Sequence, residues 1–178
     1  MATLPCESMA QGEPTGFFLE TPVSIIRPAT PADLSALGTA LAPLSLFQAY
    51  GLTAAALTQR FEAALQRGEG LLLAELEGAP VGVCWFITRG AFGTGAYLRT
   101  LAVKEGLQGK GLGVELLRGY EDGSGDPPGG WFLLASDFNT GAHRFYERHG
   151  YREVGLLPDF AAKGVTERIY WKPRPPAR

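Results

Sequence analysis

The chain has 178 residues, which is enough for one domain with a full hydrophobic core and too few for two domains of usual size. Its 16 basic and 18 acidic residues leave a formal charge of −2, which argues against a nucleic-acid or anionic-membrane partner. No apolar run approaches the about 20 residues of a membrane span. Two distant cysteines, Cys6 and Cys84, indicate neither a disulfide framework nor a zinc site. The first residues lack a secretory signal pattern, so the expected location is the cytoplasm.

The first half of the chain predicts a leader followed by alternating strands and helices. Residues 1–22 are rich in Gly and Pro without periodicity and are expected to form a loose leader before one domain spanning 23–173. The expected elements are, in chain order, a strand at 23–27, a helix through Leu34, Leu37 and Leu41 capped by Thr30 or Asp33, a helix at 53–67, and strands at 71–76 and 81–87 joined by a turn at 77–80.

The second half continues the alternation and contains no internal repeat. Its expected elements are a strand at 96–103, a glycine-rich turn, a helix through Leu112, Leu116, Leu117 and Tyr120, a flexible connection at 122–130, a strand at 131–136, a helix from Asn139 to Gly150, strands at 151–157 and 165–171, and a tail at 174–178. This order of helices and late hairpins predicts a single mixed α/β domain.

The turn after Val103 is the most informative stretch. Gly109, Gly111 and Gly113 alternate with other residues where the chain turns from a buried strand into a helix. Glycines leave a run of backbone N–H groups uncovered at a helix N-terminus, where the helix dipole favours an anion. Lys110 adds a full positive charge. The pattern predicts a pyrophosphate cradle, with an ordinary glycine-rich turn as the alternative.

Two common phosphate loops do not fit this turn. A Walker loop requires Ser or Thr after its lysine, and Gly111 follows Lys110. A Rossmann fingerprint requires a third glycine three residues after Gly113, and that glycine is missing. The spacing that fits is Gln108-x-x-Gly111-x-Gly113 after the strand, which resembles the pyrophosphate-binding motif of the GNAT superfamily of N-acetyltransferases.

A second segment strengthens this resemblance. A strand leads to Asn139, and the following helix ends in Phe145-Tyr146-x-x-x-Gly150-Tyr151, which is similar to the second GNAT motif. The two motifs together cover about residues 96–157. The resemblance implies a mixed, mostly antiparallel sheet of about six to seven strands flanked by about four helices. It also implies acetyl coenzyme A as cosubstrate and no metal.

The resemblance implies roles for individual residues. It implies that Tyr146 donates a proton to the leaving thiolate, that Asn139 contacts the pantetheine arm, and that a backbone N–H of the central strand stabilises the oxyanion. Asn139 is also a typical helix cap and Tyr146 a typical core residue. The backbone groups implied to hold coenzyme A are those of Leu101, Ala102 and Val103 for pantetheine, and of Gln108, Gly109, Lys110, Gly111, Leu112 and Gly113 for pyrophosphate.

The proton acceptor is not evident from the sequence. Many family members carry a carboxylate on the strand before the turn, where this chain has Arg99 and Thr100. The other candidates are Glu75, Asp137 and Glu77. The sequence around each of them is more typical of a solvated or structural carboxylate. Arg99 indicates either an anionic group on the acceptor or a structural ion pair.

The remaining candidates are histidines and aromatic residues. His143 and His149 are six residues apart, a spacing that does not suit a shared metal, and we interpret His143 as a surface residue and His149 as partly packed. The acceptor pocket is expected to involve segments 43–55 and 88–95. Aromatic residues that can line this pocket or the core are Phe47, Tyr50, Trp85, Phe86 and Phe92.

The sequence therefore predicts an N-acetyltransferase that passes the acetyl group of acetyl coenzyme A directly to an amine, on a small molecule or a peptide. The acceptor pocket of this fold is built from variable loops, so the sequence does not identify the acceptor. A non-catalytic acyl-coenzyme A sensor and a nucleotide-phosphate binder remain as alternatives. An exposed sheet edge is compatible with a homodimer.

Overall fold

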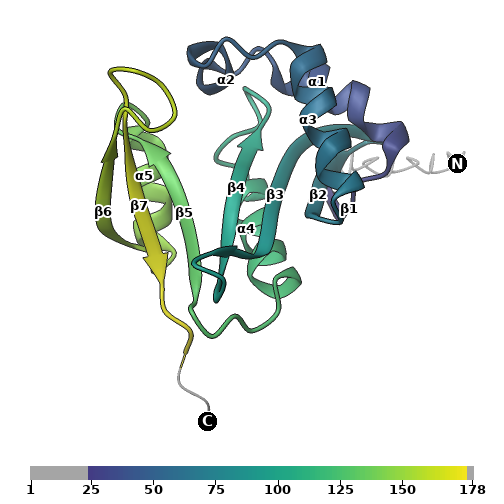
Figure 1. The fold of residues 1–178 in the computed structure, drawn as a ribbon. Helices are drawn as coiled ribbons and strands as arrows, with labels where there is room; N and C mark the ends of the chain where they lie inside the picture. Colours follow the sequence, from purple (N-terminus) through teal and green to yellow (C-terminus); the bar gives the residue numbers. More distant parts are fainter. Residues whose placement is uncertain (1–23, 176–178) are drawn as a thin grey trace, which may run out of the picture.

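The computed structural model describes residues 24–175. The predicted leader 1–22, Cys6 and residues 176–178 of the predicted tail lie outside the described residues. The described chain forms one seven-stranded sheet in the order β1-β2-β3-β4-β5-β7-β6 (Figure 1). The strands are β1 (Ser24–Pro28), β2 (Gly70–Leu76), β3 (Ala79–Ala91), β4 (Gly95–Val103), β5 (Trp131–Ser136), β6 (Arg152–Pro158) and β7 (Thr166–Lys172).

Five α-helices accompany the sheet, preceded by a short 3-10 turn at Pro31–Asp33. The helices are α1 (Leu34–Leu41), α2 (Ser45–Ala49), α3 (Ala54–Gln66), α4 (Leu112–Gly123) and α5 (Thr140–Arg148). The sequence did not predict α2, because five residues following Pro43 are too few to show helical periodicity. β3 is also longer than expected and includes part of the segment interpreted as a loop at 88–95.

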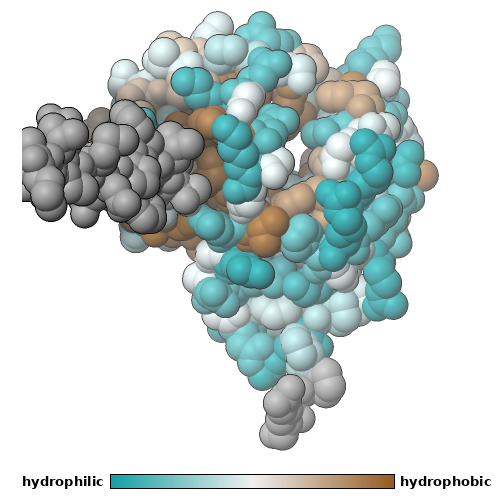
Figure 2. Space-filling model, turned by 180° about the vertical axis from the view of Figure 1, so that it is seen from behind, coloured by the Kyte–Doolittle hydropathy of each residue, from teal (hydrophilic) through white to brown (hydrophobic). Residues whose placement is uncertain are grey.

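Helices cover both faces of the first half of the sheet. On one face, leucines of α1 and Phe61 of α3 pack against Val83 and Trp85 of β3. On the other face, leucines of α4 and Tyr120 pack against Cys84 and Phe86, because alternate side chains of a strand point to opposite faces. Figure 2 views the molecule from the side of α4 and α5, where a mainly hydrophilic surface encloses smaller hydrophobic areas.

The contact between α1 and α3 depends on a glycine. A Cβ added at Gly38 would lie 2.4 Å from Thr58 Oγ1 and 2.8 Å from the carbonyl oxygen of Ala54. No side chain fits at these distances, so Gly38 permits the two helices to approach closely. This contact holds α3 against the first half of the sheet and fixes where α2, which connects the two helices, must lie.

Strands β4 and β5 form the one parallel pair of the described sheet, and they pair over a short distance. The paired residues are Ala96 with Trp131, Tyr97 with Phe132, and Leu98 with Leu133. Beyond Leu98 the two strands separate toward their C-terminal ends (Figure 1). The predicted fold class, a mixed and mostly antiparallel sheet with flanking helices, is confirmed. Within the described residues, no helix is both long and apolar enough to cross a membrane.

Candidate active site

A cleft of about 700 Å³ opens where β4 and β5 separate. One wall comes from β3 and β4, the opposite wall from β5 and β7, and α2 lies near the C-terminal end of β4 (Figure 1). Tyr146 and Asn139 contribute from the α5 side. The lining is mainly apolar and aromatic, and includes Phe47, Tyr50, Trp85, Phe92, Tyr97, Phe132, Leu134, Phe160 and Ile169. Of the aromatic candidates from the sequence, Phe86 instead packs in the core against Tyr120.

A bulge in β4 places Arg99 at this cleft. Trp85 is paired with Thr100 and the next residue, Phe86, is paired with Leu98, so Arg99 is an extra residue in the strand. A bulge redirects side chains that regular alternation would place elsewhere. The Arg99 guanidinium lies over the Trp85 ring, 4.7 Å from its centroid. Arg99 therefore lines the cleft with a defined orientation.

The glycine turn lies directly after β4 and leads into α4. Gly109 has φ +78° and Gly111 has φ +92°, which are left-handed conformations that favour glycine. The backbone N–H groups of residues 108–113 donate no hydrogen bond to any residue that the structure describes. These donors stand at a helix N-terminus, where an anion is stabilised. The turn therefore leaves a run of unpaired donors at a helix N-terminus, and the phosphate cradle predicted from its glycines stays a prediction.

The edge of β4 that faces β5 is also open. After Leu98 this edge has no strand partner among the described residues, although β4 stays paired with β3 up to Val103. The Gln108 side chain donates from Nε2 to the Val103 carbonyl oxygen at 3.2 Å, which ties the turn to the end of the strand. An extended chain can therefore add along this edge and end at the cradle.

Tyr146 lies on α5 at the floor of the cleft and is only 7% exposed. Its ring packs against Phe145, Tyr151 and Tyr170. Burial raises the pKa of the Tyr146 phenol well above its ordinary value, so the group stays protonated at neutral pH. Its hydroxyl makes no hydrogen bond with the described residues, which leaves a proton donor available inside the cleft.

Asn139 begins α5 and also lines the cleft. Its Oδ1 accepts the N–H of Ala142 at 3.2 Å, so the residue caps the helix as its type predicts. The cap uses the side-chain oxygen, and the amide nitrogen has no hydrogen-bond partner among the described residues. Capping and contact with a ligand in the cleft are therefore compatible.

A buried carboxylate that the sequence did not single out occupies the opposite wall. Glu167 of β7 is 5% exposed and lines the cleft. Its Oε1 accepts the phenol of Tyr50 at 2.5 Å and the hydroxyl of Ser136 at 3.1 Å. Burial and the bond to Glu167 raise the pKa of Tyr50 to about 12, so Tyr50 acts as a donor. The other oxygen of Glu167 accepts no hydrogen bond from the described residues.

The carboxylates suggested by the sequence as proton acceptors lie away from the cleft. Glu75 is paired with Arg27 at 2.7 Å. Asp137 accepts the backbone N–H of Thr166 at 3.3 Å, and Glu77 is an exposed residue of the β2–β3 turn. None of the three lines the cleft. Each of the three carboxylates therefore has a structural or solvated role, which the sequence already indicated as the more typical one.

His143 corrects one interpretation from the sequence. It was interpreted as a surface residue, but it is buried and its ring stacks on Tyr170. Its Nε2 donates to the Ser136 carbonyl oxygen at 2.9 Å, because a carbonyl oxygen can only accept. His149 is partly buried, in agreement with its interpretation. Among the residues that the structure describes, no group of three His, Cys, Asp or Glu could hold a metal.

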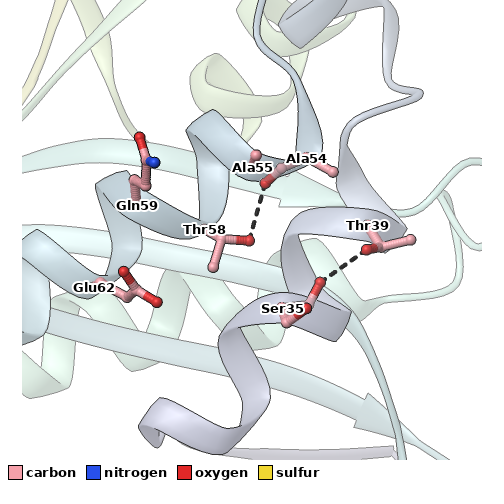
Figure 3. A pocket seen from close by; sticks show the side chains of 7 residues that line it. All are labelled: Ser35, Thr39, Ala54, Ala55, Thr58, Gln59 and Glu62. Carbon is pink, nitrogen blue, oxygen red and sulfur yellow. Dashed lines mark hydrogen bonds between the residues drawn. The ribbon is translucent and has the colours of Figure 1, made fainter.

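A second hollow, of about 440 Å³, lies between α1 and α3 (Figure 3). Two of its hydroxyls are already used by the helices themselves, since Thr39 donates to the Ser35 carbonyl oxygen and Thr58 to that of Ala54. The remaining polar side chains, Ser35, Gln59 and Glu62, belong to the same helical surface. This hollow has neither the open strand edge nor the buried carboxylate of the larger cleft, which is therefore the candidate active site.

Comparison with known proteins agrees with this choice. A family model described as the acetyltransferase (GNAT) family matches residues 41–151, which is more than half of the chain. No curated protein matches the sequence significantly. Among solved structures, a protein assigned to the GNAT acetyltransferases, from Desulfovibrio desulfuricans, superposes with a TM-score of 0.70 and 21% identity, over 83% of this chain and 97% of that one.

Two further structures show the same fold. Ribosomal-protein-alanine N-acetyltransferase from Brucella melitensis superposes with a TM-score of 0.66 and 22% identity, over 83% of this chain and 98% of that one. A protein assigned as a streptothricin acetyltransferase, from Bacillus anthracis and solved with acetyl coenzyme A, has a TM-score of 0.54 and 18% identity, over 60% and 63% of the two chains. The chain belongs to the GNAT family of acetyltransferases and is an acyltransferase.

Proposed function

We propose that this protein transfers the acetyl group of acetyl coenzyme A directly to the amine of a small molecule or peptide. One observation carries the proposal: the unpaired edge of β4 and the free phenol of Tyr146 border a single cleft, and the open N–H groups of residues 108–113 follow in the turn directly after β4. The open N–H groups and the unpaired edge of β4 suit a diphosphate with an extended arm. The phenol of Tyr146 suits the reacting end of that arm.

Two parts of coenzyme A, its pyrophosphate and its pantetheine arm, have matching groups in this chain. The N–H groups of residues 108–113 would hold the pyrophosphate, with Lys110 adding positive charge. The free edge of β4 at Leu101–Val103 would pair with the amides of the pantetheine arm, and Asn139 has an unused amide to offer it. Bound in this way, acetyl coenzyme A supplies an activated acyl group as a thioester.

Tyr146 is the proposed proton donor to the departing sulfur. Its phenol is protonated at neutral pH, because burial raises its pKa, and it has no competing partner among the described residues. A thiolate that forms in a largely apolar cleft is costly unless it is protonated or receives a hydrogen bond. A phenol at this position can provide that proton.

Glu167 is the proposed proton acceptor. A primary alkylamine is protonated at neutral pH and must lose a proton before it can attack. Glu167 lines the cleft with one oxygen held by Tyr50 and Ser136 and the other oxygen free of hydrogen bonds from the described residues. The hydrogen bonds from Tyr50 and Ser136 orient the carboxylate. Its second oxygen can then accept the amine proton.

The proton balance of the reaction can be followed on these two side chains. Glu167 takes one proton from the acceptor ammonium and passes it to water, and the amine nitrogen then forms the C–N bond while the C–S bond breaks. Tyr146 gives its proton to the sulfur and recovers the second amine proton through water. Each turnover gives one amide, one thiol and one released proton.

The proposal is tested by incubating the protein with acetyl coenzyme A and panels of amines, amino acids, polyamines and peptides. Release of free thiol together with an acetylated amine, identified by mass spectrometry, is the expected result. Tight binding of acetyl coenzyme A without transfer to any member of the panels would favour a sensing domain. Displacement of coenzyme A by ATP or NAD at lower concentration would instead favour a nucleotide binder.

A further inference from the structure

We propose that the acceptor is an amino acid with an apolar or aromatic side chain, whose amine is received by Glu167 and whose carboxylate is bound by Arg99. This inference rests on the proposed function and specifies the acceptor class for the same cleft. It is argued from the charges of the cleft, from the groups that hold these charges in position, and from the apolar lining between them.

Arg99 forms no ion pair with a carboxylate of the residues that the structure describes. The described ion pairs include no carboxylate within 4.0 Å of its guanidinium. Glu69, the carboxylate whose charge reaches Arg99, is engaged elsewhere. Its two oxygens bind Arg67, and one of them also accepts the Trp85 indole N–H at 2.6 Å. The structural ion pair that the sequence left open for Arg99 is therefore not formed.

The guanidinium is nevertheless held in place. It stacks on Trp85, whose indole is fixed by its bond to Glu69, and the β4 bulge directs it into the cleft. Stacking leaves the edge of the guanidinium, which carries its N–H donors, free to form a fork with a carboxylate. A carboxylate bound there would meet a donor whose orientation is already set.

The opposite wall provides the matching negative charge. Glu167 is the one acidic residue that lines the cleft among the described residues, whereas Arg60 and Arg99 are its basic residues. Both Arg99 and Glu167 act on the phenol of Tyr97. Burial raises its pKa, the Arg99 charge lowers it and the Glu167 charge raises it further. Tyr97, which also lines the cleft, is thus sensitive to both charges.

The remaining surface of the cleft suits an apolar side chain. Phe132, Leu134 and Ile169 also line the cleft, and Phe92 packs edge-on against Phe132. A polyamine or a lysine-rich peptide would bring extra positive charge toward Arg60 and Arg99 and would be disfavoured. A simple alkylamine would fill the apolar part and leave Arg99 without a counter-ion.

The experiment compares three amino acids with the amines that lack only the carboxylate: phenylalanine with 2-phenylethylamine, leucine with 3-methylbutylamine, and methionine with 3-(methylthio)propylamine. We expect kcat/KM to be about 10- to 100-fold higher for at least one amino acid than for its partner amine, as a charge-assisted bidentate contact would give. Calorimetric titration of each pair in the presence of coenzyme A, which cannot transfer, should show the same preference in Kd.

Arg99→Gln should reduce this preference to within about threefold, in both rate and binding. Arg89→Gln is the matched control, because Arg89 is an exposed arginine of β3 that does not line the cleft, and it should keep the full preference. Equal or better use of the partner amines, or an unchanged preference in Arg99→Gln, would overturn the inference and leave acetyl transfer intact. If no amine were acetylated at all, the proposed function would be contradicted instead. The binding titration would still show whether the cleft prefers the amino acid or the amine that lacks its carboxylate.

Discussion

The two halves of the sheet present different surfaces to the cleft. The half from β1 to β4 is covered by helices on both faces and offers an unpaired strand edge, followed by a run of free N–H groups, together with the side chains of Trp85, Tyr97 and Arg99. The half from β5 to β7 packs against α5 on one face and leaves the other open to the cleft. This second half offers side chains, including Glu167, Leu134 and Ile169.

The difference matches the two tasks of an acyltransferase. A backbone framework that is buried on both sides keeps its geometry whatever the side chains are, which suits a cosubstrate that never changes. An open sheet face can change its side chains without loss of the core, which suits an acceptor that differs between family members. The connections between the halves include the short β4–β5 pairing, a shared core between α4 and α5, the ion pair of Lys172 with Glu121 and the bond from Tyr50 to Glu167.

Gly111→Glu should have the largest effect, because it places a carboxylate in the cradle and a side chain at φ +92°. We expect coenzyme A affinity to fall on the order of 100-fold, measured by calorimetry. Gly106→Glu is the matched control: Gly106 has φ +78°, lies in the same loop before the cradle, and also has open space around an added Cβ. Equal losses in both variants would mean that backbone strain, and not the cradle, explains the effect.

Glu167→Gln tests the side-chain half. It preserves shape and removes the proton acceptor, so kcat/KM should fall about 10²- to 10³-fold while coenzyme A affinity stays the same. Glu153→Gln provides the comparison, since Glu153 of β6 forms an ion pair with Arg168 of β7 and lies outside the cleft. Activity of Glu167→Gln within threefold of the unmodified protein would remove the carboxylate from the mechanism.

Tyr146→Phe should lower kcat about 10- to 100-fold with little change in coenzyme A affinity, because only the proton donor is lost. Steady-state kinetics and calorimetry measure the two effects separately. Tyr170→Phe is a suitable control, as Tyr170 packs against Tyr146 but does not line the cleft. A kcat unchanged by Tyr146→Phe would leave Tyr146 with a packing role alone.

Tyr50→Phe removes the hydrogen bond between α2 and β7 and should lower the free energy of unfolding by about 1–2 kcal/mol, measured by urea denaturation. Since the folded pKa of Tyr50 is raised to about 12, this stabilisation is present below the unfolded value of about 10 and is lost as pH rises from there toward 12. A difference between the two proteins that grows with pH in this range would contradict the assigned donor role.

Asp33→Asn addresses the first half away from the site and should have the smallest effect, about 1 kcal/mol. Hydrogen bonds from Arg27 and Thr30 hold the pKa of Asp33 well below its usual range. Its stabilisation is therefore present above the unfolded pKa of about 4 and is lost as pH falls below it. Urea denaturation between pH 3 and pH 7 should show the two proteins converging at the acidic end.

Most of the elements expected to bind the cosubstrate could be predicted from the sequence, because their features are local. The glycines of the turn require left-handed backbone that other residues avoid, and Asn139 begins a helix because its side chain caps the first turn. The apolar spacing of α4 and α5 likewise follows from helical periodicity. The roles that the resemblance assigns to Tyr146 and to the cradle residues stay predictions until the variants above are measured.

The sequence by itself determined the segments whose structure depends on neighbouring residues, which are the strands, the glycine turn and the capped helices. It also indicated the family to which the chain belongs. Tertiary structure alone decided which charges face the cleft. Arg99 stands at a register shift between β3 and β4, where it lines the cleft and lies over the ring of Trp85. Glu167 meets Tyr50 across 117 positions of sequence, a contact that exists only once both halves of the sheet are assembled. Strand register and long-range pairing depend on the packing of the whole sheet, so no local pattern encodes them.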